Sequence, residues 1–151
     1  MDLEVLPERY AICRFEPDAA QPVWARNPAG AGLLSVTWSD TEMCVVCPDE
    51  RVPASVAADR GVMAFRIRDN LASTLSGGLA ALTAPLSDAR VPFLAISTPQ
   101  TDHLLVSAED VDRAMAVLEA TGHLVTVPPE TQGIAEVFGR QALRPNEFAI
   151  L

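Results

Sequence analysis

One short polar stretch holds the residue types best suited to bind or transform a small molecule. It lies within residues 95–106, AISTPQTDHLLV, and places Asp102 beside His103, one of only two histidines in the chain. An adjacent aspartate and histidine have the side chains of an acid–base pair, and Asp102 alone has the charge to bind an amino group. The alternatives are structural, because aspartate is a common turn former and a histidine can simply begin a strand.

Two further groups could bind an anion. The residues Ser76-Gly77-Gly78 precede an apolar helical pattern, and a glycine-containing helix N-terminus offers free N–H groups and a positive dipole. The structural alternative is that the glycines let a helix pack closely on a sheet. Arg66 and Arg68 alternate with apolar residues; they could grip a carboxylate, or they could line a solvated strand face.

The three cysteines do not indicate a metal or redox site. Cys44 and Cys47 form a C-x-x-C pair, but the sequence offers no second pair and no suitably spaced histidines for zinc. The surrounding residues, EMCVVCP, predict a strand rather than a helix N-terminus, so the two side chains are expected on opposite faces. We therefore expect structural cysteines, no metal and no cofactor.

Composition narrows the class of protein. The chain of 151 residues has 20 acidic and 11 basic residues, which gives a net charge of −9, and every basic residue is arginine. This balance argues against nucleic acid and anionic membranes as partners. The lack of lysine excludes Schiff-base and P-loop lysine chemistry. No apolar run is long enough to span a bilayer, and the N-terminal residues do not resemble a signal peptide, so a cytoplasmic protein is expected.

Hydrophobic periodicity and turn residues predict alternating strands and helices. Val111 and Leu118 share one helical face, Ser107 begins a capping-box-like S-x-x-D, and Gly122 follows as a stop signal. Pro85 is expected to kink or end another helix. The predicted strands cover residues 10–15, 33–38, 43–47, 62–69, 91–97, 103–107 and 123–127, and the predicted helices cover 53–61, 76–90 and 109–122.

The two halves of the chain show the same order of elements. LLSVTWSDTEMCVV, from Leu33, aligns without a gap with FLAISTPQTDHLLV, from Phe93, at an offset of 60 residues. This alignment places Thr41-Glu42 over Thr101-Asp102 at the tips of two hairpins. It predicts an internal repeat of a βαββαβ unit. Strands such as HLLV have apolar residues at both odd and even positions, so both faces of their sheet should be covered.

The chain resembles the small proteins built from two ACT domains, a group that includes the animal cytosolic arginine sensors. The resemblance rests on the two aligned stretches above and on LASTLSGGLAALTAPLSDARVPFLAISTPQTDHLLVSAEDVDRA and VLEATGHLV. The resemblance covers about residues 8–127. It implies an α+β fold of two ferredoxin-like βαββαβ (ACT) modules with antiparallel sheets, at 8–61 and 62–127. A C-terminal extension, 128–151, would follow. It also implies that amino acids bind at interfaces between the modules.

In that family the ligand lies beside the loop that precedes the first helix of the second module. Carried over, the implied ligand-binding residues are Thr74, Leu75, Ser76, Gly77, Gly78, Ser97, Thr98, Thr101, Asp102 and His103. The loop would bind the α-carboxylate, and the Thr101-Asp102 pair would bind an amino group or a cationic side chain. The chain departs from the family pattern at Trp38, Ser73 and Pro99, where the family commonly has arginine, an aromatic residue and tyrosine.

The resemblance implies a sensor or regulatory subunit that binds a small molecule, with an amino acid as the expected ligand, and relays its presence to a protein partner. One alternative is an interaction or assembly protein with a vestigial pocket. Another is an enzyme that uses Asp102 and His103, but the sequence holds no recognised catalytic motif. A homo-oligomer is expected. The apolar tail, 128–151, is expected to pack on the body or on a partner chain.

Overall fold

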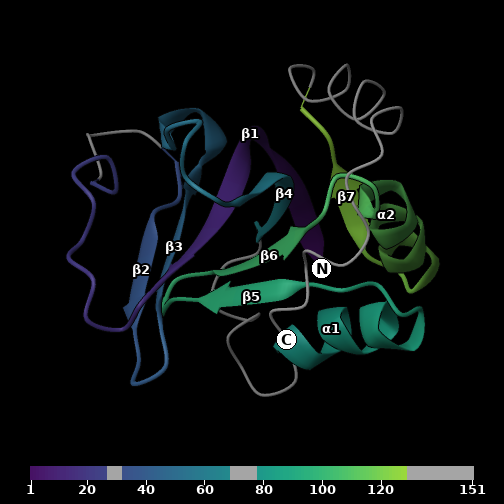
Figure 1. Ribbon diagram of the computed structural model, residues 1–151. Helices are drawn as coiled ribbons and strands as arrows, with labels where there is room; N and C mark the ends of the chain where they lie inside the picture. Colours follow the sequence, from purple (N-terminus) through teal and green to yellow (C-terminus); the bar gives the residue numbers. More distant parts are fainter. Residues whose placement is uncertain (27–31, 69–77, 129–151) are drawn as a thin grey trace. The chain divides into compact units, whose positions relative to one another are not determined.

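The computed structural model describes residues 1–26, 32–68 and 78–128 (Figure 1). The elements are β1 (Asp2–Phe15), β2 (Ser35–Trp38), β3 (Met43–Pro48), the 3-10 helix η1 (Asp49–Arg51), β4 (Asp59–Ile67), α1 (Gly78–Asp88), β5 (Leu94–Ser97), β6 (Asp102–Val106), α2 (Val111–Ala120) and β7 (Leu124–Thr126). The chain divides into two compact units. The first unit is Glu8–Val62, and the second unit is Met1–Pro7 with the chain from Met63 onward.

The second unit is an α+β sheet whose helices, α1 and α2, pack on one face (Figure 1). Its strand order is β7-β1-β4-β6-β5, and β6 runs antiparallel to both β4 and β5. Side chains alternate between the faces of a strand. Phe65 from β4, Leu82 from α1 and Leu118 from α2 are therefore able to meet in one core, where each is 0% exposed. This is the ferredoxin-like arrangement predicted for the second module.

The N-terminal residues complete this sheet, which the sequence did not indicate. The last strand, β7, pairs in parallel with β1, with Asp2 opposite Leu124 and Glu4 opposite Thr126. β1 therefore lies between β7 and β4 in the strand order. Leu3 points from β1 into the helix-covered core and is 0% exposed. The predicted module boundary at residue 62 thus leaves out a strand that belongs to the second unit.

The central strand β6 is buried on both faces, as its apolar sequence predicted. All five of its residues are buried. Leu104 belongs to the core beneath the helices. Leu105 points to the face opposite α1 and α2 and is also 0% exposed. Both faces of β6 are therefore covered.

Helix α1 accommodates Pro85 and continues to Asp88 instead of ending at the proline. A proline lacks the N–H that would bond the carbonyl four residues earlier, which here belongs to Ala81. The His123 ring lies there instead, with Nε2 3.2 Å from the Ala81 oxygen. Its Nδ1 is 3.1 Å from the amino group of Met1, which fits a ring that donates from Nε2 and accepts at Nδ1.

Helix α2 ends as predicted but begins differently. Gly122 has a φ of 92°, and its N–H bonds Glu119 while the N–H of His123 bonds Leu118, the pattern of a Schellman C-cap. The predicted capping box at Ser107 does not form, since the N-cap residue is Asp110 and no side chain caps the helix. The Ser107 hydroxyl instead donates to the Asp110 carboxylate at 2.9 Å. Neither described helix is long and apolar enough to cross a membrane.

The first unit has the strand order β2-β3-β1-β4. The antiparallel pairs place Cys13 of β1 opposite Val45 of β3, and Val45 opposite Val36 of β2. These residues belong to one core cluster with Ala25 and Val52, in which Cys13, Ala25 and Val45 are 0% exposed. Among the described residues of this unit, η1 is the only helical element.

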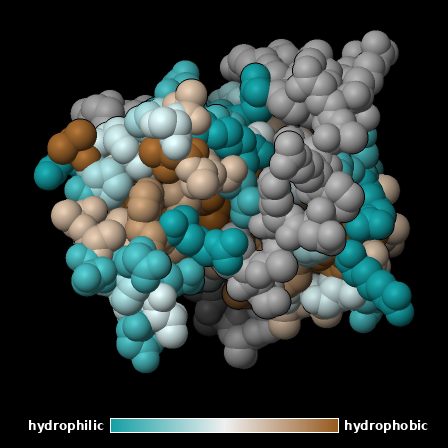
Figure 2. All heavy atoms as spheres, viewed as in Figure 1, coloured by the Kyte–Doolittle hydropathy of each residue, from teal (hydrophilic) through white to brown (hydrophobic). Residues whose placement is uncertain are grey.

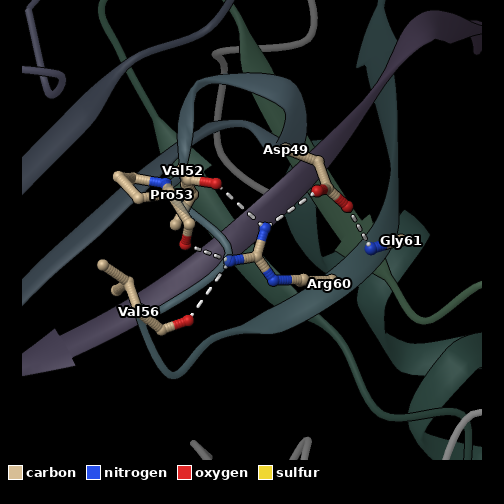
Figure 3. A network of polar contacts seen from close by, with 6 residues as sticks. All are labelled: Asp49, Val52, Pro53, Val56, Arg60 and Gly61. Atoms are coloured by element: carbon tan, nitrogen blue, oxygen red, sulfur yellow. Dashed lines mark hydrogen bonds and ion pairs between the residues drawn. The ribbon is translucent and has the colours of Figure 1, made fainter.

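The helix predicted for residues 53–61 is wrong. Residues 49–58 form η1 and turns, and β4 starts at Asp59. Figure 3 shows why: the Arg60 guanidinium donates to the carbonyls of Val52, Pro53 and Val56, at 2.8 to 3.3 Å, and to the Asp49 carboxylate at 3.2 Å. The Pro53 carbonyl also accepts the N–H of Val56, at 3.0 Å, so the segment closes as a turn beside the guanidinium.

The two hairpins repeat, although not at the predicted offset. Trp38 pairs with Met43 at the end of the β2–β3 hairpin, and Ser97 pairs with Asp102 at the end of the β5–β6 hairpin. Trp38 therefore corresponds to Ser97, an offset of 59 residues rather than 60. Met43, and not Glu42, is the counterpart of Asp102 in the first unit.

Candidate functional site

Asp102 begins β6 and is buried, with 7% of its surface exposed. It lies on the same face as Leu104, two residues further on, and this face is the one that α1 and α2 cover. Its cross-strand neighbour is Ser97, the last residue of β5. Its carboxylate makes no hydrogen bond or ion pair with any of the residues that the structure describes. Its oxygens are not among the fully buried polar atoms that lack a partner, so the carboxylate stays accessible to solvent or to a ligand.

The turn before Asp102 holds it in place. The Thr98 N–H donates to the Thr101 carbonyl at 2.9 Å, and the Thr98 hydroxyl accepts from the Thr101 N–H at 3.2 Å. The Thr101 hydroxyl donates to the carbonyl of Ile67, the last residue of β4, at 3.0 Å. The polar groups of Thr98 and Thr101 are therefore used to fix the hairpin tip against β4, which leaves the Asp102 carboxylate as the uncommitted group.

The start of α1 lies at the same end of the second unit. In Figure 1 the first turn of α1 and the arrowhead of β5 point to the same side, and β5 ends opposite the start of β6. Gly78 is the first residue of α1, and the first turn contains no acidic residue. The positive end of the helix dipole is therefore not neutralised from within the helix. Thr74, Leu75, Ser76 and Gly77 lie outside the described residues.

His103 lies on the opposite face of the sheet. Its neighbours in the ladder are Arg66 of β4 and Ile96 of β5, it is 7% exposed, and its Nδ1 has no hydrogen-bond partner among the described residues. Burial lowers the pKa of His103, the charge of Arg66 lowers it further, and Asp102 opposes the shift. His103 is therefore neutral, and its ring and the Asp102 carboxylate point to opposite faces. This geometry does not support an Asp102–His103 acid–base pair.

The two arginines considered for carboxylate binding already share a carboxylate. Glu4 on β1 forms ion pairs with Arg66, at close range, and with Arg68, whose Nε lies 3.9 Å from Glu4 Oε2. Glu4 was missed in the sequence, where nothing links the N-terminal residues to β4. The ion pairs tie β1 to β4, which favours the structural reading of Arg66 and Arg68.

Cys44 and Cys47 lie on opposite faces of β3, as predicted, and Cys13 shares the core of the first unit with Cys47. Cys13 and Cys47 are buried and Cys44 is half-buried on the other face of β3, and all three are free thiols. Burial raises the pKa of Cys13 to about 12 and also raises that of Cys44 and Cys47. Thiols that stay protonated are poor nucleophiles and poor metal ligands. Across the described residues no group of three or more potential ligands is placed to hold a metal ion.

Comparison with known families identifies the class of protein. Residues 57–120, which span β4 to α2, match the ACT domain family. Residues 8–55 match a second family model, described as an N-terminal domain. The second unit is thus built on an ACT domain, as the resemblance implied. None of the curated proteins matches the chain in sequence.

Solved structures narrow the family further. Protein Atu0741 from Agrobacterium tumefaciens is 31% identical with a TM-score of 0.77, and the match covers 84% of this chain and 92% of that one. The chain therefore belongs to the same family as this protein. The regulatory subunit of aspartate kinase from Thermus flavus is 10% identical with a TM-score of 0.54, covering 80% and 97% of the two chains.

A third solved structure is similar at the level of the fold. VC0802 from Vibrio cholerae, described as a protein of unknown function and possible transport protein, is 16% identical with a TM-score of 0.54 and coverage of 77% and 85%. At the identities of the Thermus and Vibrio proteins the likeness shows the fold alone.

Proposed function

We propose that this protein is a regulatory ACT protein whose second unit binds an amino acid. The observation that carries the proposal is Asp102, a buried residue at the start of β6 whose carboxylate has no partner among the described residues. An amino group there would gain a charge-assisted hydrogen bond to that carboxylate. An α-carboxylate would find the positive end of α1, at Gly78.

The roles of the other proposed site residues follow from their contacts. Ser97, Thr98 and Thr101 shape the hairpin tip that presents Asp102. The loop Thr74, Leu75, Ser76 and Gly77 would supply N–H groups to the carboxylate, as the ACT resemblance implies. His103 would act only indirectly, because it lies on the other face of β6.

The domain assignment supports a regulatory role. We infer that the first unit is a second, diverged ACT-like module, since its β1-β3-β2 ladder repeats the β4-β6-β5 ladder with the same hairpin turn. One solved structure with a similar fold is the regulatory subunit of aspartate kinase. A tandem ACT protein of this kind would act by changing its contacts with a protein partner or with another copy of itself when the amino acid binds. A homo-oligomer remains a prediction.

The test is a thermal-shift screen of the twenty amino acids followed by calorimetry. A ligand at a hundred times its dissociation constant should stabilise the fold by about 2.7 kcal/mol. Asp102→Asn should weaken binding by about 1.5–3 kcal/mol, because it removes a charge-assisted contact. Asp88→Asn, at the exposed far end of α1 in the same unit, is the matched control and should bind like the wild type.

Two outcomes would contradict the proposal. Unchanged affinity in Asp102→Asn would show that Asp102 is not part of the site. If no amino acid shifts the melting temperature, the alternative of an assembly protein with a vestigial pocket is favoured.

A further inference from the structure

The first unit carries an aromatic surface that the proposed function does not use. Phe15 of β1 pairs with Met43 of β3, and Met43 pairs with Trp38 of β2. Directly paired residues of neighbouring strands point to the same face, so these three side chains form a row. The Trp24 ring packs on Phe15, with ring centroids 6.2 Å apart and 49° between the planes. We call Trp24, Phe15, Met43 and Trp38 the aromatic row.

Part of the aromatic row is open to solvent. Met43 is 0% exposed, but Trp38 at the end of the row is 51% exposed. Val23, which precedes Trp24, is 81% exposed. Among the described residues only Leu124 joins these two as an exposed large hydrophobic side chain. Single exposed apolar residues are ordinary, but an exposed tryptophan aligned with two more aromatic rings is typical of an interface centre.

Acidic residues flank both ends of the row. Glu16 and Asp18 follow Phe15, and Asp40 follows Trp38 in the turn of the β2–β3 hairpin; all three are exposed. Figure 2 shows apolar residues over β2 and β3, with hydrophilic residues around the hairpin tip. Of the nearby arginines, Arg14 points to the other face of β1, since its neighbour Phe15 packs on the core.

Two further arginines do not reverse this balance. Arg26 follows the segment that carries Trp24 and is exposed, and Arg51 donates to the Arg26 carbonyl at 3.0 Å. The three exposed acidic residues outnumber these two arginines. The chain as a whole has a net charge of −9. The charge around the aromatic row is therefore negative.

We propose that the aromatic row binds a basic, arginine-containing segment of a partner protein. A guanidinium can lie flat on an indole ring and pair with a carboxylate at the same time. Phe15 and Trp38 lie two strands apart, about 10 Å, a distance that an extended peptide spans with about three residues. The surface therefore fits a short peptide better than a single small cation. It belongs to the first unit, so the inference does not depend on amino-acid binding by the second.

The experiment uses the full chain and its own fluorescence. Both tryptophans of the protein, Trp24 and Trp38, lie in the aromatic row, so their emission reports on this surface directly. The probe is a ten-residue peptide of alternating arginine and glycine, and the control peptide has glutamate in place of arginine. We expect the arginine peptide to change the emission in a saturable way, to bind more weakly at higher salt, and the glutamate peptide to have no effect.

A matched pair of variants separates the aromatic row from general charge attraction. Trp38→Ala should weaken arginine-peptide binding, measured by calorimetry, by roughly tenfold, through loss of the cation–π contact. Leu124→Ala removes a comparably exposed apolar side chain, 61% exposed, from the second unit and should bind like the wild type. Circular dichroism would confirm that both variants are folded.

Each other outcome would overturn the inference. Equal binding by Trp38→Ala and wild type would mean that the peptide follows net charge alone. No binding would remove the surface as a basic-peptide site. If sedimentation shows that the protein self-associates and that Trp38→Ala abolishes this, the aromatic row is an interface between two copies of the chain.

Discussion

The β2–β3 and β5–β6 hairpins share one turn and differ in the residue that follows it. In each turn a hydroxyl, of Ser39 or Thr98, accepts a hydrogen bond from a backbone N–H two or three residues on, and its own N–H bonds the last carbonyl of the turn at 2.9 Å. The next residue is Met43 in the first unit, at 0% exposure, and Asp102 in the second, at 7%. The same backbone thus supports a core side chain in one unit and an unpartnered carboxylate in the other.

The neighbouring row of each ladder shows the same divergence. Arg14, Cys44 and Thr37 form the row in the first unit. Arg66, His103 and Ile96 form it in the second. Each row begins with an arginine and has at its centre a titratable group, the half-buried Cys44 or the buried His103, which burial keeps neutral. Within these two ladders, the units therefore differ in the chemistry at a few equivalent positions rather than in the strand pairing.

The largest expected effect comes from exchanging Met43 and Asp102. Met43→Asp places a carboxylate in the core of the first unit and should lower the free energy of unfolding by about 3–5 kcal/mol. Asp102→Met replaces a carboxylate that has no partner among the described residues and should leave the free energy of unfolding unchanged or raise it, while abolishing amino-acid binding. Urea unfolding followed by circular dichroism measures both changes. Met43→Leu, which conserves volume, should cost less than about 1.5 kcal/mol.

One result of the Met43 and Asp102 substitutions would contradict the assignment of Asp102 to a binding site. If Asp102→Met destabilises the fold as strongly as Met43→Asp, then Asp102 is a structural residue and the contrast between the two hairpins does not mark a binding site.

The next effect concerns the connection after each hairpin. After β6 the chain forms α2, whereas after β3 it forms η1 and the loop held by Arg60 (Figure 3). Arg60→Ala should lower the free energy of unfolding by about 1–2 kcal/mol; the effect is moderate because the Arg60 and Asp49 side chains are 31% and 23% exposed. Arg60→Lys should recover little, since an ammonium cannot serve several acceptors in the plane of a guanidinium.

The control for Arg60 is an ion pair on the surface of the second unit. Arg113 donates to Asp110 at 2.9 Å and its side chain is 53% exposed. Arg113→Ala should change the free energy of unfolding by less than about 0.5 kcal/mol. Equal effects of the two variants in urea unfolding would show that the loop after β3 does not depend on Arg60.

The sequence predicted the elements whose signals are local. Apolar alternation located the two hairpins and β4, and helical periodicity with Gly122 located α2 and its end. The sequence-based prediction failed where a residue distant along the chain determines the local structure. The proline and glycine at the two ends of residues 53–61 favour a helix, but the Arg60 guanidinium bonds the carbonyls of Val52, Pro53 and Val56 in a loop of turns. Pro85 should disturb α1, because it leaves the Ala81 carbonyl without its helical donor. The ring of His123, 42 residues after Ala81, lies at that carbonyl instead.

The candidate site was predictable only in part for the same reason. The Asp102 position followed from the family resemblance, and its burial without a described partner adds weight to it. The face of His103 could have been foreseen, because adjacent strand residues alternate. Glu4 could not have been foreseen, since its ion pairs with Arg66 and Arg68 depend on β1 entering the sheet between β7 and β4.

A smaller, pH-dependent effect distinguishes His103 from its counterpart Cys44. Burial lowers the pKa of His103 from 6.5 in the folded protein, so the unfolded chain takes up the proton first as the pH falls. The contribution of His103 to stability is therefore fully present above pH 6.5 and is lost as the pH falls toward the folded-state pKa, by at most about 1.4 kcal/mol per pH unit.

The measurement compares unfolding of wild type, His103→Leu and Cys44→Ala between pH 5 and 8. The stability difference between wild type and His103→Leu should shrink or reverse as the pH falls. Cys44→Ala should show a constant difference, because burial and Glu42 raise the pKa of Cys44 above 9.0, outside this range. A difference for His103→Leu that does not vary with pH would mean that the ring is equally solvated in both states.

The smallest effect tests whether the shared turn has the same importance in both units. Ser39→Ala and Thr98→Ala each remove one hydroxyl from an exposed turn, where it bonds backbone groups at 3.1 to 3.3 Å. Each should lower the free energy of unfolding by about 0.5–1 kcal/mol, because water replaces part of the lost bonding. Only Thr98→Ala should also weaken amino-acid binding, by a few fold, since its turn positions Asp102 whereas the Ser39 turn precedes the apolar Met43. Calorimetric titration of both variants with the amino acid found in the screen measures this difference. Equal affinities in the two variants would show that the turn is only a connection in both hairpins, and that Asp102 is positioned by the β4–β6 pairing alone.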